Sequence, residues 1–94
     1  MDKAFILRLT EYLNSECDDY GMNYDYEWSE DEGCCNVTIT TDRNDRSTCL
    51  KFRYNEEKDD LEIELSENSY YTTREFDESV KYFWMLVSPS LFPI

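Results

Sequence analysis

The sequence predicts a two-layer α+β domain, in which a four-stranded antiparallel meander lies between an N-terminal and a C-terminal helix. Two segments, 4–17 and 76–87, carry apolar residues at the helical period, and four shorter segments between them alternate apolar and polar residues. Short connections favour pairing of consecutive strands, and 94 residues suffice for one hydrophobic core. We therefore expect residues 1–94 to form one acidic domain of order α-β-β-β-β-α.

Each predicted helix has an apolar stripe that faces the sheet. The stripe of the first helix is Phe5, Ile6, Leu9, Tyr12, Leu13 and Cys17. The stripe of the second is Phe76, Val80, Phe83, Trp84 and Val87. Gly21 is the expected stop of the first helix, Thr72-x-x-Glu75 predicts a capping box before the second, and Ser88-Pro89 predicts its end.

The four predicted strands are 22–28, 34–41, 48–54 and 61–66. In each, every second side chain should enter the core, and the intervening side chains should face solvent. The expected inward set is Met22, Tyr24, Tyr26, Trp28, Cys35, Val37, Ile39, Leu50, Phe52, Tyr54, Leu61, Ile63 and Leu65. Tyr70 and Tyr71 follow the last strand and are expected to be exposed.

Net charge is the most unusual property of the chain, because 22 acidic residues face nine basic ones for a total of −13. Over a compact diameter of roughly 30 Å this is about one charge per 2.5 Å, against about one per 1.7 Å of duplex DNA. The acids concentrate in residues 22–33 and 55–67, with the basic stretch Arg43–Arg53 between them. In a four-stranded meander these acidic segments would form the two sheet edges, roughly 14 Å apart and close to the ~12 Å width of the major groove.

These acids are the predicted partner-binding surface. Cross-strand pairing of Arg53 with Glu62 and of Lys51 with Glu64 would occupy part of it, which leaves the remaining acids unpaired. The predicted DNA-mimic carboxylates are Asp25, Glu27, Glu30, Asp31, Glu32, Glu56, Glu57, Asp59, Asp60, Glu62, Glu64 and Glu67.

Catalysis and metal binding are not expected. The chain has no His, no Gly-rich loop and no complete calcium-loop motif, since Asp42-x-Asn44-Asp45 is only a fragment. Cys34 and Cys35 are adjacent in a strand, so they point to opposite faces and cannot join Cys17 and Cys49 in a zinc site. We expect no enzyme activity, no cofactor and no direct nucleic-acid binding.

The cysteines also bear on the compartment. No signal peptide precedes them and none form a C-x-x-C pair, so we expect reduced thiols in a cytoplasm, with Cys35 in the core and the other three half-exposed. The longest apolar run, 82–87, is too short to span a membrane.

The acidic, aromatic-rich segments Asp25-Tyr26-Glu27, Glu30-Asp31-Glu32 and Glu56-Glu57-Lys58-Asp59-Asp60 resemble the carboxylate surfaces of phage-encoded DNA mimics. In size and element order the chain is most similar to the anti-restriction nuclease proteins of T-even phages. That resemblance implies action in the host cytoplasm, where the protein would occupy the DNA-binding surface of the McrBC restriction endonuclease or of another host DNA-binding protein.

Two other function classes remain open at this point. An immunity or antitoxin protein that neutralises a basic toxin such as a nuclease would share the acidity but need aromatic anchors in a shaped interface. A small enzyme or metal-binding protein is the third class. The apolar tail Leu91-Phe92-Pro93-Ile94 could also support a homodimer.

Overall fold

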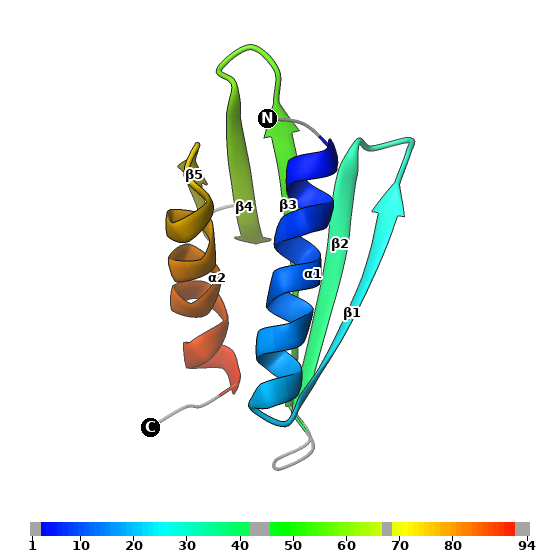
Figure 1. Cartoon of the computed structure of the whole chain (residues 1–94), viewed down its shortest axis with the longest axis vertical. Helices are drawn as coiled ribbons and strands as arrows, with labels where there is room; N and C mark the ends of the chain where they lie inside the picture. Colours follow the sequence, from blue (N-terminus) through cyan, green and yellow to red (C-terminus); the bar gives the residue numbers. More distant parts are fainter. Residues whose placement is uncertain (1–2, 42–45, 67–68, 92–94) are drawn as a thin grey trace.

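The computed structural model describes residues 3–41, 46–66 and 69–91 and contains five strands and two helices (Figure 1). In chain order these are α1 (Lys3–Asp19), β1 (Met22–Ser29), β2 (Cys34–Thr41), β3 (Arg46–Asn55), β4 (Asp60–Ser66), β5 (Ser69–Thr73) and α2 (Phe76–Leu91).

The strands form one antiparallel sheet of order β1-β2-β3-β4-β5. Both helices lie on the same face of this sheet (Figure 1). Within the described residues, the opposite face carries no helix, and we call it the open face. The predicted α+β class, the two layers and the two terminal helices are confirmed, whereas the predicted count of four strands is wrong.

The missed element is β5, in which Tyr70 to Thr73 are residues that favour strands but do not alternate between apolar and polar side chains. It pairs with β4, and Thr72 lies opposite Glu62 in the sheet. Thr72 therefore does not cap α2 as predicted. Its neighbour Thr73 does, because its Oγ1 accepts the Glu75 N–H at 3.1 Å and donates to Glu78 at 3.2 Å.

The fifth strand also changes the edges of the sheet. β1 is one edge, as predicted, but β4 is an interior strand and β5 is the other edge. The edge strand β5 contains no charged residue. The prediction that both acidic strands are edges is therefore wrong for β4.

The core lies between the helices and the covered face of the sheet. Ile6, Leu9 and Leu13 of α1 are fully buried, as are Phe83 and Val87 of α2. From the sheet, the core receives Met22, Tyr24, Cys35, Val37, Ile39, Leu50, Phe52, Leu61 and Ile63. Burial of a side chain of this size stabilises the fold by about 1.5–3 kcal/mol.

Two predicted core residues are more exposed than expected. Tyr12 is 46% exposed on α1, where its ring makes an edge contact with Phe76. Tyr26 is 42% exposed although it lies opposite the buried Val37, because β1 is the edge of the sheet. The exposure predicted for Tyr70 and Tyr71 is confirmed, at 57% and 36%.

The helix ends follow local backbone chemistry. Gly21, at φ 73°, ends α1 as predicted, and the Tyr20 N–H bonds back to the carbonyl of Glu16. Pro89 does not end α2, which continues to Leu91. Proline removes one N–H but keeps a helical φ, so the last turn retains its path. Phe92 to Ile94 of the predicted apolar tail lie outside the described residues, as does the fragment 42–45.

Three of the four cysteines are buried: Cys17, Cys34 and Cys35. The prediction is thus confirmed for Cys35 and wrong for Cys17 and Cys34. Burial raises the pKa of the Cys17 thiol to about 12 and, to a lesser degree, the pKa values of Cys34 and Cys35. Only Cys49 is exposed among the four.

This difference predicts a thiol-labelling pattern. Ellman's reagent should react rapidly with one thiol per folded chain and with four in denaturant, because only Cys49 is accessible to the reagent. Cys49→Ser should abolish the fast phase and leave three thiols that react only on unfolding. Fast reaction of a second thiol in the folded protein would contradict the described packing.

Candidate partner-binding surface

The two acidic turns lie at the same end of the sheet. The β1–β2 turn and the β3–β4 turn both follow an upward-running strand in Figure 1, and the N-terminus of α1 lies beside them. Their hairpins are two strand spacings apart, roughly 10 Å. We define the acidic end as the exposed carboxylates of these turns, which are Glu30, Asp31, Glu32, Glu56, Glu57 and Asp59.

A lysine from α1 fixes the first carboxylate of the β1–β2 turn. Lys3 Nζ donates to Glu30 Oε1 at 2.9 Å and also lies 4.8 Å from the centre of the Trp28 ring. The bond from Lys3 holds the pKa of Glu30 below its ordinary value. Glu30 was predicted to be unpaired and is instead paired across 27 residues of sequence.

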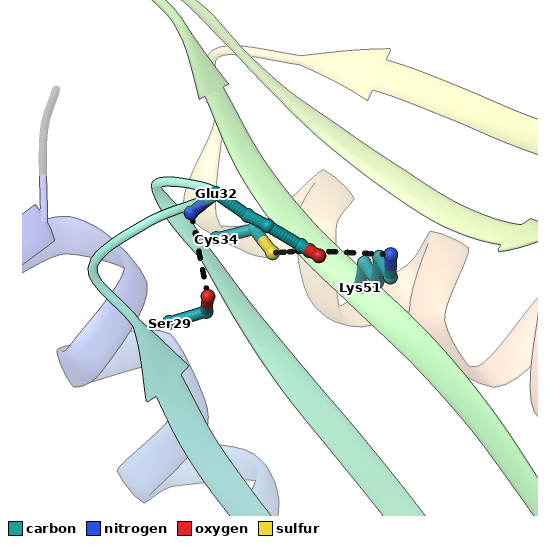
Figure 2. A network of polar contacts seen from close by, with 4 residues as sticks. All are labelled: Ser29, Glu32, Cys34 and Lys51. Carbon is teal, nitrogen blue, oxygen red and sulfur yellow. Dashed lines mark hydrogen bonds and ion pairs between the residues drawn. The ribbon is translucent and has the colours of Figure 1, made fainter.

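Glu32 is held by three neighbours, which Figure 2 shows together. Its backbone N–H donates to Ser29 Oγ at 3.3 Å. Its carboxylate accepts the Cys34 thiol at 3.3 Å and Lys51 Nζ at 3.4 Å, both on Oε2. The side chain thereby folds back over Cys34, which is buried although it lies on the open face. These two donors, the thiol first, lower the pKa of Glu32.

The β3–β4 turn is held through its backbone. The Lys58 N–H donates to Asn55 Oδ1 at 3.1 Å, and Arg74, from the β5–α2 connection, donates to the Lys58 carbonyl at 2.8 Å. Asp59 adopts a positive φ of 52° and accepts the Tyr54 hydroxyl, which lowers its pKa. Glu56 and Glu57 are exposed at the tip of this ordered turn.

The open face carries two further acidic rows. Asp25 and Glu27 are exposed on β1, while Glu62 and Glu64 are half-buried on β4. The strand order places β1 and β4 three spacings apart, roughly 14 Å, which is the predicted separation. A basic strip from β3 lies between the rows, and its members are Lys51 and Arg53.

The predicted cross-strand pairs are correct in register only. Lys51 is opposite Glu64, and Arg53 is opposite Glu62. However, the ion pair that Lys51 makes is with Glu32, and Glu62 accepts a hydrogen bond from Asn55 at 3.1 Å. Lys51 therefore pairs with Glu32 of the β1–β2 turn and not with Glu64, the residue opposite it in the sheet.

Eleven of the twelve predicted site residues are described, and Glu67 lies outside the described residues. Six of them form the acidic end, and Asp25, Glu27, Glu62 and Glu64 lie on the open face. Asp60 begins β4, and its Oδ1 is buried without a hydrogen-bond partner among the described residues.

Sequence reasoning missed further residues at this end. The first turn of α2 adds the exposed acids Asp77 and Glu78 beside the start of the helix. The acid-rich capping segment of the helix was a signal for these residues. The supporting roles of Lys3 and Arg74 had no local signal, since each contacts a turn far away in sequence.

The molecule is longer than a compact sphere, with principal extents of 40 × 26 × 24 Å. Along the longest extent the net charge of −13 amounts to about one charge per 3 Å, so it is less dense than in duplex DNA at about one per 1.7 Å. The density estimated from a 30 Å sphere was therefore too high, and the net charge per unit length does not by itself match that of DNA.

The described residues contain no group of three or more Cys, Asp or Glu side chains placed to hold a metal ion. Within 3–41, 46–66 and 69–91, no helix has the length and apolar character needed to cross a membrane. No protein-family model, no curated protein and no solved structure matches the chain.

The Glu32 network predicts a pH-dependent contribution to stability. A carboxylate with a lowered pKa stabilises the fold above its unfolded-state pKa, near 4.5, and loses this contribution as the pH falls through the folded-state pKa. Cys34→Ala should raise the pKa of Glu32 toward its ordinary value near 4.5, measured by NMR titration of the side-chain carboxyl carbon.

At acid pH, where Glu32 is protonated in both proteins, the difference in unfolding free energy between wild type and Cys34→Ala should become smaller by the part that depends on Glu32. Cys49→Ala is the matched control, because the Cys49 thiol contacts Thr38 on the open face and should leave Glu32 unchanged. An unchanged Glu32 titration in Cys34→Ala would contradict the assignment.

Proposed function

We propose that this protein is a DNA mimic, which binds the DNA-binding surface of a nuclease or other DNA-binding protein and blocks access of DNA. The observation that carries the proposal is the gathering of six exposed turn carboxylates at one end of the sheet, continued by acidic rows on the open face. Such a surface attracts the Lys and Arg side chains with which proteins hold phosphates.

The spacing of the acids supports the proposal. The rows of β1 and β4 are roughly 14 Å apart, and the two turns are roughly 10 Å apart. These separations bracket the ~12 Å width of the major groove, across which phosphate rows face one another. A protein that grips a duplex through phosphates on both sides of that groove would meet carboxylates at similar positions.

The rigidity of the acidic end is a second support. Glu32 and Asp59 each accept a hydrogen bond from a side chain, and Arg74 braces the β3–β4 turn. A carboxylate that is already oriented loses little conformational entropy on binding. Contacts with lysine partly neutralise Glu30 and Glu32, so Asp31, Glu56 and Glu57 should contribute most of the attraction.

The resemblance to the phage anti-restriction family points to a particular target, a host restriction endonuclease of the McrBC type. The fold is compatible with this target because the acidic end protrudes as turns, which can enter a channel that otherwise holds DNA. The proposal does not require McrBC, since any phosphate-gripping channel of similar width would present the same chemistry.

Competition for DNA binding tests the proposal. The wild-type protein should displace duplex DNA from McrBC in a gel-shift assay at about 0.05 M salt, and the effect should weaken steeply toward about 0.2 M salt. Asp31→Asn/Glu56→Gln/Glu57→Gln should raise the half-inhibitory concentration by at least about tenfold, since three ion pairs with the partner are lost.

The control variant carries the same charge change elsewhere. Glu11→Gln/Asp18→Asn/Asp19→Asn neutralises three exposed acids of α1, and it should shift the half-inhibitory concentration by about twofold or less, because screening weakens distant charges. Equal losses in both triple variants would show that only net charge matters. No displacement by the wild-type protein would refute McrBC as the target.

The immunity or antitoxin alternative has one observation in its favour. Tyr70 is 57% exposed on the uncharged edge strand, and Tyr71 stacks on Tyr82 with ring centres 4.7 Å apart. Aromatic anchors of this kind are typical of specific protein interfaces. Under this alternative, binding to a basic toxin would persist at high salt and be lost in Tyr70→Ser.

A further inference from the structure

A hollow of about 350 Å³ opens between the two acidic turns. Trp28 and Tyr54 are its aromatic lining residues, Glu32 and Glu56 line it from the two turns, and Lys3 and Arg53 complete the lining with Gly33. We call this hollow the notch.

The chain already places a cation of its own in the notch. Lys3 Nζ lies 4.8 Å from the centre of the Trp28 ring and 2.9 Å from Glu30 Oε1. An aromatic face with a carboxylate at its rim is the environment that binds cationic side chains. Because Lys3 and Glu30 are 47% and 79% exposed, their contact is weak and can be exchanged for another cation.

We infer that the notch binds one arginine side chain of the basic partner, with the guanidinium displacing Lys3 from Trp28 and pairing with Glu56. This inference rests on the proposed function, which supplies a partner rich in Lys and Arg. It adds a shaped, residue-specific contact to a surface otherwise defined by charge.

Arginine fits this environment better than lysine. Its planar guanidinium can stack on an aromatic face while its N–H groups, which lie in the guanidinium plane, donate to a carboxylate. The ammonium of lysine is instead a compact and strongly hydrated charge. Arginine is also among the residues that dominate binding energy at interfaces. Once Lys3 is displaced, Glu30 loses that partner, and together with the lining acids Glu32 and Glu56 it outnumbers the remaining lining cation Arg53.

Arg53 supports a different occupant, which the test must separate. Its Nε is buried and has no hydrogen-bond partner among the described residues, so a carboxylate of the partner could be drawn to it. The surplus of acids around the notch opposes an anionic ligand. Charge complementarity therefore favours arginine.

NMR titration with blocked tripeptides tests the inference without the partner. The probes are Gly-Arg-Gly, Gly-Lys-Gly and Gly-Glu-Gly, and the readout is the indole N–H signal of Trp28, with that of Trp84 as an internal reference. The arginine peptide should shift the Trp28 signal saturably and more strongly than the lysine peptide, and Trp84 should not respond.

Two matched pairs of variants distinguish binding of the arginine peptide in the notch from its general electrostatic attraction to the acidic protein. Glu56→Gln should weaken the arginine peptide by about two- to fivefold, the effect of one exposed ion pair, while Glu57→Gln, outside the notch, should not. Lys3→Ala should tighten binding because the resident cation is gone, and Lys58→Ala, with the same charge change, should have a smaller effect.

Equal shifts with the arginine and lysine peptides, equal effects of Glu56→Gln and Glu57→Gln, or preference for the glutamate peptide would each overturn the inference. None of these outcomes touches the DNA competition, which depends on the summed charge of the acidic end. Conversely, a notch that selects arginine in a protein that displaces DNA neither from McrBC nor from other DNA-binding proteins would refute the proposed function alone.

Discussion

Antiparallel pairing of consecutive strands is the constraint on which the acidic end depends. In such a sheet, alternate turns emerge at the same end, so the first and third turns are brought together regardless of the 25 residues between Glu30 and Glu56. The register also sorts side chains, because residues opposite one another share a face. One pairing pattern therefore buries the apolar set under the helices and exposes the acids together.

Concentration of like charge opposes folding, but the repulsion between two carboxylates is smaller than the stabilisation from burying one core side chain. Two unit charges about 10 Å apart in water repel by about 0.4 kcal/mol, and salt reduces this further. A single buried side chain of the core contributes about 1.5–3 kcal/mol. The contacts made by Lys3 and Lys51 lower the repulsion where carboxylates crowd within one turn.

Much of this arrangement can be predicted from the sequence, because it depends on local patterns. The alternation in β1 to β4 predicts which side chains face the core, and Gly21 marks the end of α1. The alternation pattern does not detect the fifth strand, because Tyr70 to Thr73 favour strands but do not alternate apolar and polar side chains. Pro89 does not end α2, because proline removes one backbone hydrogen bond but keeps a helical φ. The pairing of Glu32 with Lys51 was not predictable, since only the folded turn brings them together.

We propose that the acidic end is the surface that contacts the partner. Hydrogen–deuterium exchange on the complex with McrBC, or with another DNA-binding protein that the chain displaces from DNA, tests it most directly. We predict slower exchange in residues 30–33 and 56–59, with no change at the far end of the sheet around Tyr20 and Gly21. Protection confined to β5 and α2, with both acidic turns unchanged, would contradict it.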